Sequence, residues 1–264
     1  MEVLFYDAPQ CTSWLVKRFE SINYTGGPII EKFIPTKYSG IVFHFDDLPT
    51  LSAPFQMQLP KYFVVPLRPV ATTIRLEGNL HTFIALCKPT VLSAILHIEL
   101  THPTLPYVPL PAALFEPLWQ ELSKATTDQE RVDIFCSYFN TKICKNYKPD
   151  ELDTLYDYIL TRSKATRICD IISEYSKSNR TLQRAFYKRT GITPKSLLRI
   201  VRINHIWQSI KNGTPPDYQD LVLEGNYFDQ THFIKDFKAI TGETPGSFFN
   251  RDLKIVKALS GNKY

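Results

Sequence analysis

The chain has 264 residues, of which 44% are hydrophobic and 22% charged, and its net charge is +5. This balance is typical of a folded protein with one large domain or two ordinary ones, and it excludes disorder over most of the length. The longest apolar runs fall far short of the ~20 residues that cross a bilayer, and the amino terminus lacks an export signal, so we expect a cytoplasmic protein without a membrane partner.

The cysteines are five in number, scattered, and never spaced as CxxC. They are Cys11, Cys87, Cys136, Cys144 and Cys169. This pattern argues against both a disulfide framework and a zinc knuckle, so we expect reduced, partly buried thiols.

Up to about residue 100 the sequence consists of short β-branched and aromatic runs separated by turn signals. The runs cover residues 40–45, 62–65, 72–77 and 82–86. Turns are expected at Gly26-Gly27-Pro28 and at Gly78-Asn79. Such runs predict an antiparallel sandwich or small barrel. Residues 101–111 carry four prolines and are predicted to form an extended surface loop.

Beyond this loop the apolar residues recur at helical spacing. Asp128 is expected to cap a first helix. Its apolar stripe consists of Val132, Phe135, Tyr138, Phe139 and Ile143. A second helix is expected to begin near Pro149, because proline favours the first helical turn. Its apolar side consists of Leu152, Leu155, Tyr156 and Ile159.

Excess positive charge lies entirely in the second half of the chain. Residues 1–148 hold 13 lysines and arginines against 13 acidic residues, whereas residues 149–264 hold 18 against 13. No acidic residue lies between Tyr175 and Pro216, where nine residues are basic: Lys177, Arg180, Arg184, Lys188, Arg189, Lys195, Arg199, Arg202 and Lys211. A phosphate backbone would suit this stretch, although on charge alone a solvated helix face explains it equally well.

The basic half contains an internal repeat with an offset of 51 residues. Residues 186–198 match residues 237–249 without a gap, in the frame F-x-x-x-T-G-x-T-P-x-S. Gly191 and Gly242 can adopt the left-handed conformation that ends a helix. The Thr-Pro pair that follows each glycine then caps and starts the next helix.

Each copy of the repeat is predicted to be a helix-turn-helix. Ser178 aligns with Asp229, and both are good N-cap residues. A shorter helix is expected in front of each, at residues 165–175 and 216–225. One helix from Pro194 to about Lys211 would join the units. Its length of ~27 Å would let the two units enter successive major grooves about 34 Å apart.

The outer faces of the two longer helices carry the side chains that DNA recognition needs. The first helix should bury Leu182, Ala185 and Phe186 and present Arg180, Gln183, Arg184, Tyr187 and Lys188. Arginine can bind guanine and glutamine can bind adenine through two hydrogen bonds each, while lysine and tyrosine reach phosphates. The second helix should present Thr231, Ile234, Lys235 and Lys238, and its lower charge predicts a smaller share of the affinity.

Residues 227–238, YFDQTHFIKDFK, followed by TGETP at 241–245, closely resemble the signature of the AraC/XylS family of bacterial transcription regulators. Residues 182–194 resemble part of that family's first helix-turn-helix, and the resemblance covers about residues 150–250. It implies base contacts from six residues: Arg180, Gln183 and Arg184 in the first unit, and Gln230, Thr231 and Lys235 in the second.

The chain departs from the family pattern at three positions. Asn226 replaces a usual glycine, but asparagine tolerates positive φ, so the turn should survive. Ile172 and Val222 replace the small residue typical of each first helix, which puts the relative orientation of the units in doubt.

The same resemblance implies that the first domain senses an effector or dimerises, through a cupin-like sandwich. It implies RNA polymerase as a partner if the protein is an activator. The helices between residues 114 and 147 would supply a homodimer contact through Phe135, Cys136, Tyr138 or Phe139. Equally, these helices could simply cover the sandwich.

No catalytic, metal or cofactor motif is recognisable. His44, His81, His97 and His102 lie in the β-rich half without an HxH or HxxxE pair, so no metal site is expected. No Gly-rich phosphate loop and no nucleophile motif occurs. Aromatic residues of this half could line an effector pocket, although they more often fill a core. The candidates are Trp14, Phe43, Phe45, Tyr62, Phe63 and Phe83.

The sequence thus predicts an α+β protein with two domains and a short tail. Residues 1–147 form a β-sandwich or cupin-like domain, β-rich to about 100, with flanking helices from about 112. Residues 148–255 form an AraC-type, all-α DNA-binding domain of two helix-turn-helix units, and residues 256–264 form the tail.

The predicted function is sequence-specific DNA-binding transcription regulation, with no enzymatic activity and no cofactor. The partners are double-stranded DNA and an effector whose site and identity are unknown. Two alternatives remain: a metal-dependent cupin-type enzyme fused to a DNA-targeting module, and a non-specific nucleic-acid binder.

Overall fold

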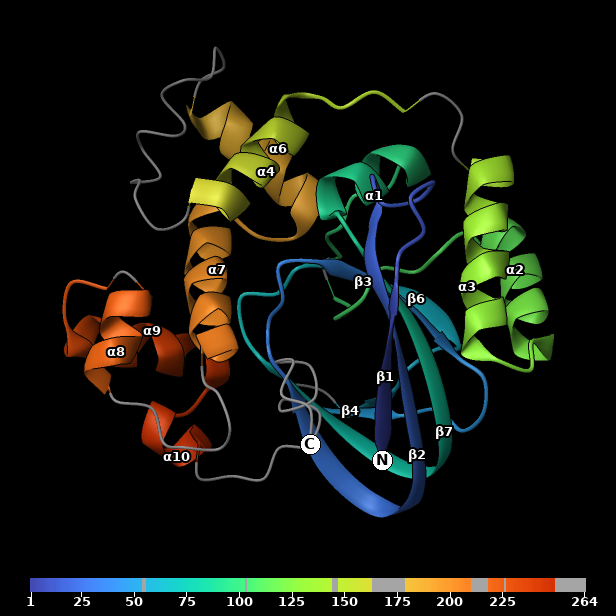
Figure 1. Cartoon of the computed structure of the whole chain (residues 1–264), viewed down its shortest axis with the longest axis horizontal. Helices are drawn as coiled ribbons and strands as arrows, with labels where there is room; N and C mark the ends of the chain where they lie inside the picture. The colour runs from blue at the N-terminus through green and yellow to red at the C-terminus, as the bar shows by residue number, and fades with distance from the viewer. Residues whose placement is uncertain are drawn as a thin grey trace.

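The computed structural model describes residues 1–53, 56–102, 104–143, 147–162, 179–209, 218–225 and 227–249. A strand-rich first half precedes a helical second half, which confirms the α+β class (Figure 1). None of the helices in these ranges is both long enough and apolar enough to span a bilayer.

The strands form one antiparallel sheet. They are β1 (Glu2–Asp7), β2 (Val16–Phe33), β3 (Ser39–His44), β4 (Thr50–Ala53), β5 (Met57–Gln58), β6 (Tyr62–Val65) and β7 (Thr72–Cys87). The order is β1-β2-β7-β3-β6, and β4 pairs with both β5 and β7. Because β3 pairs with residues 82–87 of β7 and β4 pairs with residues 73–75, one long strand joins the two parts of the sheet.

Two predicted turns are wrong. Gly26 and Gly78 lie inside β2 and β7, directly opposite each other, where the strand register shifts between Gly26 and Ile29. Gly78 has φ of 89°. These glycines form a bulge in two continuous strands, so the runs 72–77 and 82–86 belong to one strand. Bulges and tight turns both favour glycine, which is why the sequence pattern did not separate them.

The helices are α1 (Pro89–Leu96), α2 (Ala112–Lys124), α3 (Asp128–Tyr138), a π-helical turn η1 (Phe139–Ile143), α4 (Glu151–Arg162), α6 (Asn179–Thr190), α7 (Pro194–Ser209), α8 (Tyr218–Glu224), α9 (Gln230–Thr241) and α10 (Pro245–Phe249). Helix α1 was not predicted, because its short apolar run also suits a buried strand. Thr127 rather than Asp128 caps α3, since its side chain accepts a hydrogen bond from the Glu130 amide.

Helices α2 and α3 cover one face of the sheet, opposite the helices of the second half (Figure 1). Alternate strand residues point into this core, with Phe19, Phe43 and Phe83 fully buried. The rings of Phe135 and Phe139 stack there at 4.2 Å between centroids.

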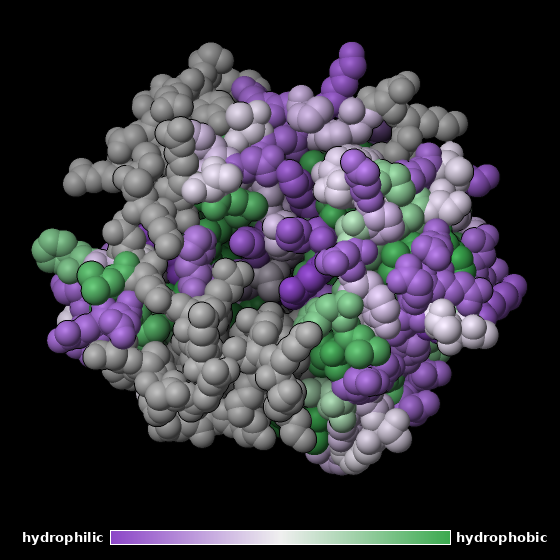
Figure 2. Space-filling view, viewed as in Figure 1, coloured by the Kyte–Doolittle hydropathy of each residue, from purple (hydrophilic) through white to green (hydrophobic). Residues whose placement is uncertain are grey.

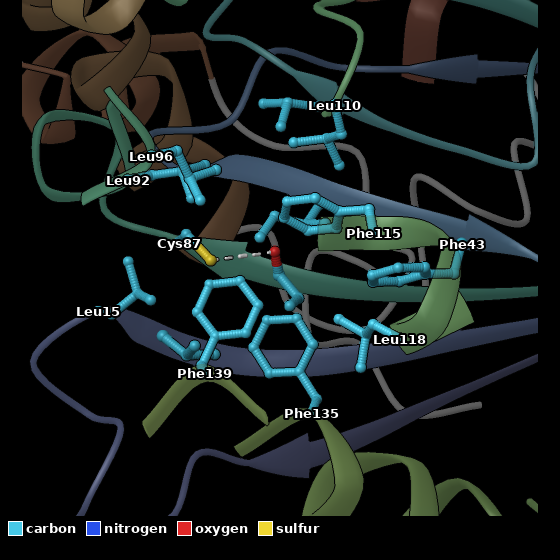
Figure 3. Packing of buried hydrophobic residues seen from close by; sticks show 14 of the residues in the cluster. Leu15, Phe43, Cys87, Leu92, Leu96, Leu110, Phe115, Leu118, Phe135 and Phe139 are labelled. Carbon is cyan, nitrogen blue, oxygen red and sulfur yellow. Dashed lines mark hydrogen bonds between the residues drawn. The ribbon is translucent and has the colours of Figure 1, made fainter. Parts of the chain in front are cut away.

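Burial in this core corrects the proposed dimer contact. Phe135, Cys136 and Phe139 are all buried, and Figure 3 shows both aromatic rings facing the sheet. Tyr138 is half-buried, and its hydroxyl donates to the Leu114 carbonyl at 2.6 Å. The alternative interpretation, that these helices cover the sheet, fits the structure.

Helix α7 connects the two helical clusters of the second half (Figure 1). Its first turns pack Leu197 and Val201 with α4 and α6, and its later turns pack Ile203 and Ile206 with α8 and α9. The predicted apolar side of α4 is buried in the first cluster. The predicted short helix at 165–175, the cap at Ser178 and the helix end near Lys211 lie outside the described residues.

Candidate nucleic-acid interface

Helix α6 presents the polar face that the sequence predicts. Its inward residues Leu182 and Phe186 are fully buried. Its outward residues are all exposed: Arg180, Gln183, Arg184, Tyr187 and Lys188. One side of the helix therefore anchors it, while the other side is available to a partner.

Helix α9 repeats this arrangement with fewer charges. Asp229 caps it by accepting a hydrogen bond from the His232 amide at 2.7 Å. Gln230, Thr231 and Lys235 are exposed. Ile234, which was expected on the outer face, is half-buried against the cluster that holds Phe233 and Phe237.

The two units end their longer helices with the same geometry. Gly191 and Gly242 have φ of 88° and 84°, as predicted for left-handed helix ends. In front of each glycine a threonine hydroxyl, Thr190 or Thr241, donates to the carbonyl four residues earlier at 2.9 Å. The sequence frame contained this threonine, but its part in ending the helix was not predicted.

The carboxyl end of α6 is attached to the first domain. The Leu67 amide donates to the Thr190 carbonyl at 3.1 Å, and the Leu100 amide donates to the Lys188 carbonyl at 2.7 Å. Lys188 also forms an ion pair with Glu99 at 2.5 Å. A residue predicted to contact phosphate is therefore engaged by a carboxylate of the first domain.

Arg189 strengthens this attachment from the inner side of α6. Its guanidinium donates to the Thr90 carbonyl at 2.9 Å and pairs with Asp150 at 2.8 Å. Burial alone would raise the pKa of Asp150, but the hydrogen bond and charge of Arg189 outweigh it and lower that pKa. The sequence analysis assigned Arg189 only to the basic run.

The carboxyl end of α9 is held by the same part of the first domain. The Ala71 amide donates to the Ile240 carbonyl at 2.7 Å, and Lys32 donates to the Thr241 carbonyl at 3.0 Å. Lys32 also forms an ion pair with Glu243, and the two side chains are only 13% and 14% exposed. The loop of residues 66–71 between β6 and β7, here called the 66–71 loop, thus holds both longer helices by their ends.

A cavity of about 170 Å³ lies on the sheet face opposite α2 and α3. Its lining is mostly aliphatic and comes from β2, β3, β6 and β7, from residues 33–36, and from the 66–71 loop. Alternate strand residues line it, including Val42, Ile84 and Leu86. The loop that holds both helices is therefore also part of a cavity wall.

Most of the predicted pocket aromatics lie elsewhere. Phe63 does line the cavity. Phe43 and Phe83 point to the other face of the sheet, because strand residues alternate, and they fill the core. Trp14, Phe45 and Tyr62 are partly buried against that same core. The effector-pocket interpretation is thus wrong for most of the set.

A few polar groups stand in this apolar lining. His44 is buried; its Nδ1 lies 2.8 Å from the Thr82 hydroxyl, and its Nε2 has no hydrogen-bond partner among the described residues. Burial lowers the pKa of His44 to about 3, so the ring is neutral at pH 7. Arg68 donates to the Pro106 carbonyl at 2.8 Å, and its buried Nε has no partner in the part of the chain that the structure describes. These groups could orient a bound molecule.

Metal ligation has no candidate cluster of three or more ligands in the described ranges. His44 faces the cavity, and His97 ends α1 with φ of 53°. His81 binds Asp128 at 3.0 Å. Burial raises the pKa of Asp128, but hydrogen bonds from His81 and Ser21 outweigh it and lower the pKa to about 2. Asp128, which was expected to cap the helix that is now α3, instead accepts hydrogen bonds from His81 and Arg131.

Comparison with known proteins gives one family match. Residues 172–251 match HTH_18, the family described as a helix-turn-helix domain. No curated protein matches the chain.

Several solved structures align with most of this chain, each at low sequence identity. ToxT from Vibrio cholerae shares 12% identity at a TM-score of 0.48, over 88% of this chain and 97% of its own. ToxT bound to (E)-4-(8-methylnaphthalen-1-yl)but-3-enoic acid shares 11% identity at 0.48, over 94% and 98%. The AraC-like transcriptional activator CuxR shares 9% identity at 0.24, over 94% and 90%.

Residues 172–251 are therefore a DNA-binding helix-turn-helix domain, and this range contains α8 and α9. The domain is of the AraC type, and the signature at residues 227–245 lies within the matched residues.

Proposed function

We propose that this chain regulates transcription by binding DNA at specific sequences, with α6 and α9 as the recognition helices of two units. The observation that carries the proposal is the exposed polar face of each helix. Each face combines side chains that read base edges with side chains that reach phosphates. Because α7 joins the units, one chain would span two successive major grooves.

The two kinds of side chain have separate roles in this proposal. Arg180, Gln183 and Arg184 read bases in the first unit, and Gln230, Thr231 and Lys235 read bases in the second. Tyr187 and Lys188 contact phosphates. Base contacts supply sequence choice, whereas phosphate contacts supply affinity that falls with salt and is the same for all sequences.

Regulation by a small, largely apolar effector is part of the proposal. The cavity supports it, because its wall includes the 66–71 loop and residues 33–36. The same segments bond to α6, α7 and α9 through Leu67, Pro35 and Ala71. A ligand that favours one arrangement of this wall would therefore bias how the helices are presented. ToxT has been solved with an unsaturated fatty acid bound.

Partners beyond DNA and the effector follow from the family. If the protein is an activator, RNA polymerase is its partner. A homodimer remains part of the proposal, but its contact must lie outside Phe135, Cys136 and Phe139, which are buried.

The experiment is selection of a preferred duplex from a random pool, followed by titration at one fixed salt concentration. Arg184→Ala should lose ~1 to 3 kcal/mol of binding to the preferred duplex and little to random duplex. Lys188→Ala, the control, should weaken both duplexes alike. Failure to enrich any sequence, or equal losses for Arg184→Ala on both duplexes, would indicate the alternative, a non-specific binder.

A further inference from the structure

Phe228 is the most exposed large hydrophobic side chain among the described residues, at 93%. Hydrophobic atoms protrude at the left edge of Figure 2, where Figure 1 places the turn between α8 and α9. A buried phenylalanine stabilises a fold by ~1.5 to 3 kcal/mol relative to an exposed one, so folding gains almost nothing from this ring.

The start of α9 does not need Phe228. The residue before an N-cap often packs on the fourth helical residue, here Phe233, and so fixes how the chain enters the helix. Tyr227 takes this role, because it is only 6% exposed and its ring lies 5.5 Å from that of Phe233. The neighbouring aromatic is therefore left in solvent, directly in front of the N-cap Asp229.

The position of Phe228 in the unit indicates what it meets. In a helix-turn-helix, the amino-terminal residues of the recognition helix contact base edges in the major groove. Phe228 adjoins Gln230 and Thr231, two exposed residues of that end of α9. The apolar group that the major groove offers is the C5-methyl group of thymine. A protein-docking patch would be contiguous and apolar, whereas the residues that follow Phe228 are exposed and polar.

We propose that Phe228 packs against a thymine methyl group in the half of the DNA site bound by α9, and so selects thymine at one position. This inference rests on the proposed function. The second unit carries fewer charged side chains than the first. A contact between Phe228 and thymine would let it discriminate between sequences without an additional basic residue.

The test uses the full chain and the preferred duplex, in which each thymine in turn is replaced by deoxyuridine. Removal of a methyl group from an apolar contact costs ~0.8 kcal/mol, about fourfold in affinity. We expect one replacement to weaken wild-type binding about fourfold and to have no effect on Phe228→Ala. Phe228→Leu should retain the sensitivity, because leucine keeps an apolar contact.

Leu223→Ala is the matched control, because Leu223 is also exposed, at 77%, but lies in α8. It should respond to the same replacement as the wild type. The proposal is overturned if Phe228→Ala and the wild type respond alike at every thymine. It is also overturned if Phe228→Ala binds DNA normally but loses only transcription with RNA polymerase, which would assign the ring to a protein partner. If no duplex is preferred at all, the proposed function itself fails.

Discussion

The two copies of the 51-residue repeat, here called the first unit (α6) and the second unit (α9), share one local frame but are attached to the first domain in different ways. In the first unit, Lys188, Arg189 and Thr190 at the end of α6 all bond to the first domain. In the second unit, the attachment is the Ala71 amide on α9 and the ion pair of Lys32 with Glu243. Among the described residues, the first unit is thus held through three consecutive residues of a helix end, and the second through the Ala71 amide and the side chain of Lys32.

The two glycines that end these helices have different surroundings. A Cβ atom on Gly191 would lie 2.8 Å from the Leu67 carbonyl oxygen and 2.9 Å from that of Leu100. On Gly242 it would meet no atom of the described residues within 4 Å. The repeat therefore specifies the same helix end twice, whereas the surroundings give Gly191 a second role in the domain contact.

Replacing each glycine by alanine should give the largest change in the free energy of unfolding. Comparing the two variants should separate the role of glycine in ending a helix from its role in the contact between domains. Gly242→Ala is expected to cost ~1 to 2 kcal/mol, the penalty for a side chain at positive φ. Gly191→Ala should cost at least ~1 kcal/mol more, because it also displaces backbone that carries interdomain hydrogen bonds. Urea unfolding of both variants measures this difference. Equal losses of unfolding free energy in the two variants would mean that the contact of Leu67 and Leu100 with α6 contributes nothing to stability.

Lys32→Met should release the second unit while leaving the first attached. The substitution breaks a mostly buried ion pair and removes the Lys32 cation from Glu243, and we expect a loss of ~2 kcal/mol or more. Hydrogen exchange should show reduced protection of the Ala71 amide and unchanged protection of the Leu67 and Leu100 amides. Lys61→Met is the control, because its pair with Glu116 is 40% and 35% exposed, and such a solvated pair contributes little to stability. Parallel loss of protection at all three amides would show that the units are released together.

Glu99→Gln should have the smallest effect of these substitutions, and the effect should be on DNA affinity through the first unit alone. It frees Lys188 from an exposed ion pair of ~0.2 to 1 kcal/mol, so affinity for random duplex should rise by up to about fivefold. Glu77→Gln removes the same charge from an exposed pair with Arg75 and serves as the control. An equal rise in both variants would indicate a general effect of net charge instead of release of Lys188.

The sequence predicts the helix-turn-helix parts well because their signals are local. Glycine at a helix end, threonine and proline at the next start, and apolar residues at helical spacing each act within a few residues. The same holds for the buried side of α4. The sheet was predicted less well: β7 was divided in two because the glycine of a bulge has the same signature as the glycine of a turn.

The attachment between domains could not be predicted from the sequence. Leu67, Ala71 and Leu100 act through their backbone amides, which every residue except proline possesses, so residue type carries no signal. The cavity was misassigned for a related reason. Aromatic content does not reveal which face of a strand a residue occupies, and Phe43 and Phe83 occupy the core face.

The most direct test of the central claim is guanine methylation interference on the preferred duplex. If α6 and α9 read successive major grooves, methylation at N7 should weaken wild-type binding at two clusters of guanines about 10 base pairs apart. Arg184→Ala should lose sensitivity in one cluster and Lys235→Ala in the other. A single cluster, or a pattern that neither substitution changes, would contradict the account of two groove-reading units on one chain.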